Sequence, residues 1–176
     1  IVDPAYDITG ILDILAEDDM RCTGVLATHY HPDHVGGSMM GYDIIGAKEL
    51  LEQVSVPIHA QAKEAEFIRK VTGVGPTDVV EHTSGDLVTV GGIDIELIHT
   101  PGHTPGSQCF LVDNRLVAGD TLFLEGWPHR PARRRPGTTL PKPHPTLRQS
   151  TRQRRVVSRP PVFAGPFGFP GRHATK

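Results

Sequence analysis

The sequence predicts a layered α/β (α+β) domain over residues 1–126, followed by an irregular basic tail over residues 127–176. Strand and helix signals alternate along the first part, which is typical of layered domains. The charge balance then changes abruptly. Residues 1–126 hold all 20 acidic residues and 6 of the 18 Lys and Arg, whereas residues 127–176 hold the other 12 basic residues, no acidic residue and 10 of the 16 prolines. The two parts therefore follow different compositional rules.

The predicted elements follow from periodicity and turn residues. Apolar residues at helical spacing predict helices at residues 8–17 and 62–71, with Asp7 as the N-cap of the first. Residues 44–54 are predicted to form a short helix or a loop. Strands are predicted at residues 23–28, 56–59, 87–90, 93–99, 108–112 and 115–118. Gly91 with Gly92, and Asp113 with Asn114, supply turns between the later strands.

The composition excludes several classes of protein. No apolar run approaches the roughly 20 residues of a membrane span, so no membrane association is expected. Two cysteines, Cys22 and Cys109, do not make a disulfide framework, and reduced thiols fit a cytoplasmic protein. No signal-peptide pattern opens the chain. Because it begins at Ile1, without Met and inside an expected strand, we expect a truncated N-terminus.

The first chemical motif follows the strand at residues 23–28. Residues 28–37 read THYHPDHVGG, which places His29, His31, Asp33 and His34 within six positions. Imidazole nitrogens and carboxylate oxygens are ligands that suit zinc and similar metals. In an extended loop His29 and His31 point the same way, while Asp33 and His34 turn toward a neighbouring point. A single histidine is usually structural, but this cluster favours a site for one or two metals.

Two further loops carry matching residues. His103 lies between two Pro-Gly turns in residues 99–107, HTPGHTPGS, and stiff chain holds it at the end of a strand. Asp120 follows another apolar strand in residues 117–123, VAGDTLF, where a carboxylate can bridge two cations. A turn alone explains Gly-Asp-Thr equally well. Together with the other two loops, however, it indicates a metal centre.

The segments HYHPDHVGG, TPGHTPGS and AGDTLF, in this order, resemble the metallo-β-lactamase superfamily, and within it the glyoxalase II (hydroxyacylglutathione hydrolase) branch. The resemblance covers about residues 1–126. It implies an αββα sandwich, incomplete in this chain, with the metal site at one edge between two sheets. It also implies hydrolysis of a small-molecule substrate, a thioester in this branch, through a metal-bound hydroxide.

The resemblance further implies a ligand set. The first metal would take His29, His31 and His103. The second would take Asp33, His34 and a bridging Asp120, with one more histidine from a C-terminal loop. One or two zinc ions are implied, and iron is an alternative. Asp33 and Asp120 would be the catalytic carboxylates, with Asp33 orienting the nucleophile or assisting proton transfer.

Two other functions remain open from the sequence. Persulfide dioxygenases are similar to this branch and hold one Fe(II) with two histidines and a carboxylate, here His29, His103 and Asp120. The chain is alternatively an inactive remnant of the fold. The sequence carries no signal for an oligomeric state or for a specific nucleic-acid partner.

The tail departs from the family pattern after residue 126. One interpretation is a disordered basic segment that contacts nucleic acid unspecifically. We favour a second interpretation, a shifted reading frame, because back-translation from Trp127 in the next frame permits GRTDLPGG and later PGHLY. Both resemble the family's sequence at these points. The last metal histidine is then lost, and His129, His144 and His173 are assigned no role.

Overall fold

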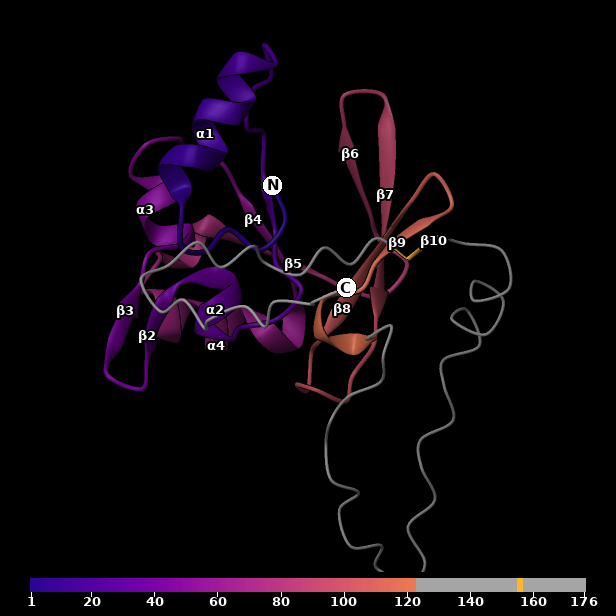
Figure 1. Cartoon of the computed structure of the whole chain (residues 1–176). Coiled ribbons are helices and arrows are strands. Elements are labelled where there is room, and N and C mark those ends of the chain that lie inside the picture. Colours follow the sequence, from indigo (N-terminus) through magenta and orange to yellow (C-terminus); the bar gives the residue numbers. More distant parts are fainter. Residues whose placement is uncertain (123–154, 157–176) are drawn as a thin grey trace, which may run out of the picture.

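The computed structural model describes residues 1–122 and 155–156, and these form helices and strands in two main sheets (Figure 1). The first half of the chain contains α1 (Ile8–Glu17), β1 (Val25–Leu26), α2 (Pro32–Val35), β2 (Gly37–Met39), β3 (Tyr42–Ile44), α3 (Ala47–Leu51), β4 (Ile58–Gln61) and α4 (Ala62–Thr72). The second half contains the turn η1 (Pro76–Asp78), β5 (Val79–His82), β6 (Leu87–Val90), β7 (Ile93–His99), β8 (Gln108–Val112), β9 (Arg115–Val117), η2 (Gly119–Thr121) and β10 (Arg155–Val156).

The first sheet is parallel, with strand order β1-β4-β5. Parallel neighbours need crossover connections, and here the chain between β1 and β4 includes α2 and α3, while α4 joins β4 to β5. The hairpin of β2 and β3 stands apart from this sheet. Figure 1 shows α1 to α4 gathered with β4 and β5 on one side of the molecule.

The second sheet has the order β10-β9-β8-β7-β6 and is antiparallel from β6 to β9. The predicted turns are confirmed at both hairpins. Asp113 and Asn114 have φ angles of 45° and 59°, as a two-residue hairpin loop requires. Gly91, with φ of 61°, begins the turn between β6 and β7.

The core shows that the two sheets pack face to face. In β1 and the residue after it, Val25 and Ala27 pack among the helices, whereas Leu26 points the other way and contacts the second sheet. There it meets Val88 and Phe110. This alternation follows from the two-residue period of a strand. Within the described residues the layers are therefore helices, parallel sheet and second sheet, in agreement with the predicted layered α/β fold.

Most predicted elements are confirmed, with several different bounds. The helix at 8–17 is confirmed, with Asp7 Oδ1 accepting the Gly10 amide at 2.9 Å. The strand predicted at 23–28 is shorter, because the Thr28 amide donates to the Asp3 side chain and not to a neighbouring strand. The strand predicted at 56–59 begins later, at Ile58, directly after Pro57, which has no N–H to donate.

Within residues 1–122 the sequence did not predict the short strands β2, β3 and β5, the one-turn helix α2, or the turns η1 and η2. The expected irregular tail, including its histidines, lies outside the described residues apart from β10. Those two residues pair in parallel with β9, Arg155 opposite Arg115. Among the helices that the structure describes, none is long and apolar enough to cross a membrane.

Candidate metal centre

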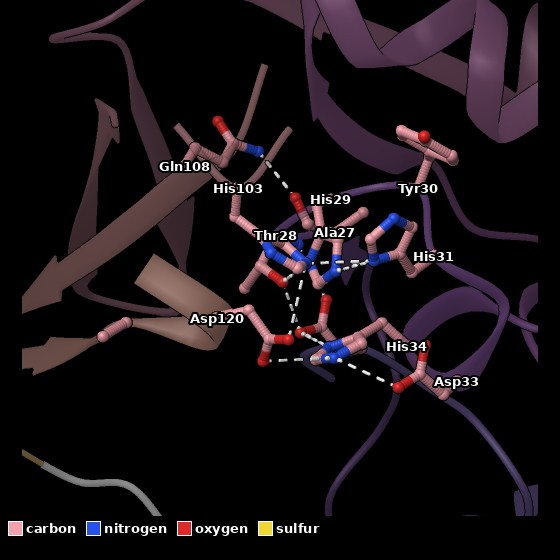
Figure 2. A network of polar contacts seen from close by, with 12 residues as sticks. Ala27, Thr28, His29, Tyr30, His31, Asp33, His34, His103, Gln108 and Asp120 are labelled. Atoms are coloured by element: carbon pink, nitrogen blue, oxygen red, sulfur yellow. Dashed lines mark hydrogen bonds and ion pairs between the residues drawn. The ribbon is translucent and has the colours of Figure 1, made fainter. Parts of the chain in front are cut away.

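The three predicted loops meet at one edge of the two sheets (Figure 2). The first loop leaves β1, the second joins β7 to β8, and Asp120 lies in η2, which begins one residue after β9. The side chains that the structure brings together are His29, His31, His34, His103 and Asp120, with Asp33 at the margin. Because these residues come from strands in both sheets, the edge between the sheets positions the site.

Three histidines form the tighter group. The ring nitrogens of His29, His31 and His103 lie within 4.8 Å of one another. His29 Nε2 lies 3.1 Å from His31 Nδ1, and His103 Nε2 lies 3.0 Å from the same nitrogen. Three convergent imidazoles are a common zinc-binding set. This is the set that the family resemblance implies for the first metal.

A second group consists of His29, His34 and Asp120, also within 4.8 Å. His34 Nε2 lies 3.4 Å from Asp120 Oδ1, and the other oxygen of Asp120 lies 3.5 Å from His103 Nε2. The carboxylate of Asp120 thus contacts one histidine on each side, which is the place that a bridging ligand needs.

Asp33 lies farther from the centre than the other five residues. Its Oδ2 is 3.9 Å from His34 Nε2, and its side chain is 40% exposed. Asp33 belongs to neither compact group, although the family resemblance implies it as a ligand of the second metal. Its position on the open side suits contact with solvent or substrate.

The local conformation of the first motif differs from the expected extended loop. Residues 32–35 form the one-turn helix α2, with Pro32 at the first helical position, where proline's fixed φ is favourable. Asp33 and His34 therefore project from a helical turn. Gly36, with φ of +86°, ends the turn where a Cβ would lie 2.6 Å from Gly46 Cα. Only glycine fits this position without displacing the neighbouring backbone.

Burial keeps His29 in the form that binds metals. The side chain is 1% exposed, and its Nδ1 lies 3.0 Å from Thr28 Oγ1. Burial is the main cause that lowers the pKa of His29 to about 2, and the neighbouring His34 and His31 lower it further. Burial also lowers the pKa of His31. Both imidazoles are therefore neutral near pH 7 and offer a lone pair.

His34 is oriented by a residue that the sequence did not suggest. Its Nδ1 lies 3.0 Å from Asp3 Oδ2, and because a carboxylate only accepts, Nδ1 carries the proton and Nε2 faces Asp120. Burial alone would lower the pKa of His34, but the hydrogen bond to Asp3 and the charges of Asp3 and Asp120 raise it. In the sequence, Asp3 is recognisable only as part of an Asp-Pro pair in an expected strand. Such pairs are too common to predict that Asp3 orients a histidine.

The donor set fits a resident metal. Imidazole nitrogens with one carboxylate suit zinc and also suit iron, and the buried histidines lie close enough to share an ion. The orienting hydrogen bond from His34 to Asp3 is the usual partner arrangement of a metal-binding histidine.

Comparisons with known proteins agree with this geometry. Residues 1–161 match the family model described as the metallo-beta-lactamase superfamily. The chain is 33% identical over 126 residues to a probable polyketide biosynthesis zinc-dependent hydrolase, BaeB, of Bacillus velezensis, covering 71% of this chain and 50% of BaeB. It is 35% identical over 130 residues to the hydroxyacylglutathione hydrolase of Hahella chejuensis, covering 72% of this chain and 43% of that enzyme.

A solved structure is also similar to this chain in fold and sequence. The crystal structure of ETHE1 from Myxococcus xanthus aligns with a TM-score of 0.53 and 28% identity, over 70% of this chain and 47% of that one. The chain thus spans about half the length of these relatives.

Proposed function

The chain belongs to the metallo-β-lactamase superfamily, and we propose that it is a metal-dependent hydrolase of a small-molecule thioester. The convergence of His29, His31 and His103 beside His34 and Asp120 carries this proposal. The similarity to a hydroxyacylglutathione hydrolase and to a zinc-dependent hydrolase supports the class of reaction and the choice of zinc.

The residues divide into two sets of ligands. His29, His31 and His103 would hold one ion, and His34, Asp33 and Asp120 would contribute to a second, with Asp120 between the two. Zinc or iron bound there lowers the pKa of a water molecule and polarises a carbonyl oxygen.

Asp33 is the carboxylate best placed to handle a proton. It lies at the exposed margin of the centre, near His34, and is less buried than Asp120. As the oxygen of water bonds to the thioester carbon, Asp33 accepts the proton of that water. The C–S bond then breaks, and the proton passes to the departing thiolate to give a carboxylic acid and a thiol.

We place the hydrolase before a mononuclear dioxygenase because the donor set extends beyond a three-residue triad. The dioxygenase would need His29, His103 and Asp120 alone. Each of the two compact groups instead includes a residue outside that triad, His31 in one and His34 in the other. The similarity to ETHE1 keeps the dioxygenase as the second candidate to be measured.

Two activities of the metal-loaded protein are measured. One is hydrolysis of a thioester, and the other is oxygen uptake in the presence of a persulfide. Both the 176-residue chain and a version with its reading frame restored after residue 126 are assayed. We expect thioesterase activity that falls at least 100-fold in His31→Ala and Asp33→Asn, because each loses a group at the centre. Asp43→Asn changes an exposed carboxylate on β3 and serves as the control.

Oxygen uptake that survives His31→Ala, without thioesterase activity, would show the dioxygenase. Absence of both activities in the restored version would indicate an inactive remnant of the fold.

A further inference from the structure

A buried carboxylate lies behind the metal centre, on an element that contributes none of the candidate ligands. Glu64 is the third residue of α4 and is only 1% exposed. Its Oε2 accepts a hydrogen bond from the Tyr30 amide at 3.0 Å. Its Oε1 accepts from Thr104 Oγ1 at 2.8 Å and from the Gly106 amide at 2.6 Å. One carboxylate thus binds two loops that are far apart in the sequence.

The groups that Glu64 binds are the chain neighbours of candidate ligands. Tyr30 lies between His29 and His31 in the first loop, and Thr104 directly follows His103 in the second. The nitrogens of His31 and His103 face each other at 3.0 Å. Glu64 therefore sets the separation of the two loops at the point where their histidines meet.

The second loop is shaped to reach this carboxylate. A Cβ at Gly106 would lie 2.6 Å from Glu64 Cγ and 2.9 Å from the Glu64 backbone nitrogen, so only glycine permits the approach. Thr104 is oriented in turn by Ser107, whose Oγ lies 2.7 Å from Thr104 Oγ1 and accepts the Thr104 amide at 3.0 Å. The residues TPGS that follow His103 thus give the second loop the conformation in which it contacts Glu64.

The chemistry of the contact suits an acceptor with two oxygens. Three donors converge on two oxygens, and hydrogen bonds to a charged acceptor are stronger than neutral ones. The first turn of a helix also stabilises negative charge. Burial of a carboxylate is otherwise unfavourable, and these three hydrogen bonds offset that cost.

We propose that Glu64 is a positioning residue that holds the loops of His31 and His103 at the spacing a metal requires. This inference rests on the proposed metal-dependent function. Without the carboxylate the two loops are free to separate, and the site formed by His29, His31 and His103 loses affinity. The pair of His34 and Asp120, which Glu64 does not contact, is affected less.

The experiment titrates Co²⁺ into the full chain and records its ligand-field absorption, together with thermal unfolding of the metal-free protein. Glu64→Gln keeps the size of the side chain but replaces one acceptor with an NH₂ group. We expect the Co²⁺ dissociation constant to rise at least tenfold, with a changed absorption spectrum. Glu66→Gln changes an exposed carboxylate on the same helix and is expected to leave the Co²⁺ dissociation constant and the absorption spectrum unchanged.

Glu64→Asp provides the second test, and it decides the matter if Glu64→Gln does not fold. It keeps the charge but is one methylene shorter, so we expect weakened Co²⁺ binding because it cannot span both loops. Unchanged Co²⁺ affinity and spectrum in the folded variants would overturn the inference, even if their thermal stability falls. Failure of the parent chain to bind Co²⁺ would overturn the proposed function, and this inference with it.

Discussion

Asp3 accepts a hydrogen bond from Nδ1 of His34 at 3.0 Å, although 31 positions separate the two residues in the sequence. The same carboxylate accepts the amide and the hydroxyl of Thr28, both at 2.7 Å. Asp3 therefore ties the start of the chain to the end of β1 and to α2. It also fixes the proton on one nitrogen of His34 and leaves the other facing Asp120.

Replacing Asp3 tests this orientation. In Asp3→Asn the amide no longer requires a proton on His34 Nδ1, so the ring loses its fixed tautomer and direction. We expect metal affinity at the group of His34 and Asp120 to fall about 10- to 100-fold. The measurement is competitive Zn²⁺ titration against a chelator. Asp13→Asn, an exposed change on α1, is the matched control, and equal affinities in the two variants would contradict the orienting role.

Metal content provides a second prediction. The three histidines of the first group are all present, whereas the part of the chain that the structure describes places no further histidine in the second group, although the family resemblance implies one. We expect one tightly bound zinc or iron per chain and a weakly held second ion. Elemental analysis after dialysis measures this. Two tightly held ions per chain would contradict it, and would mean that another residue completes the second group.

The sequence predicted the elements whose pattern is local. The helix at Ile8–Glu17 has a regular apolar stripe and a capping aspartate. The strands β6, β7 and β8 have the predicted bounds because turn residues or Pro-Gly pairs flank them. The donor loops were found because their histidines and aspartates are concentrated after apolar strands. Such signals do not depend on distant contacts.

The features that the sequence did not predict depend on such contacts. The short strands β2 and β3 become regular by pairing with each other, and α2 replaces an expected extended loop. Asp3 and Glu64 look like ordinary acidic residues until the fold places them 3.0 Å from a histidine ring nitrogen and a loop amide, respectively. Orienting residues of this kind carry no spacing rule, because only the folded chain brings them to the site.

A third prediction concerns pH and a histidine pair away from the metal centre. His59 on β4 and His82 on β5 lie with Nδ1 and Nε2 2.9 Å apart. Burial lowers the pKa of His59, and the charges of His82 and of the amino group at Ile1 lower it further. The folded chain therefore binds a proton at His59 less readily than the unfolded chain, whose histidine has a pKa of about 6.5.

The stability that His59 contributes is thus complete above about pH 6.5 and falls as the pH drops toward the lowered pKa of the folded state. We expect the free energy of unfolding to decrease between about pH 7.5 and about pH 5.5, and to decrease less in His59→Gln. Urea unfolding at both pH values measures the difference. His82→Gln should also reduce the decrease, because it removes a neighbouring positive charge. Equal pH dependence in the parent and both variants would disprove the assignment.

The final prediction concerns the reading frame after residue 126. All acidic residues lie before this point, and the next frame from Trp127 permits GRTDLPGG and PGHLY, which resemble the family. We expect sequencing of the coding DNA to show that a single-base change near codon 126 restores this segment. The restored chain should hold two tightly bound metals in place of one, because the histidine of PGHLY completes the group of Asp33, His34 and Asp120. Replacing that histidine with alanine should return the content to one, whereas unchanged metal content on restoration would show that the segment does not complete the site.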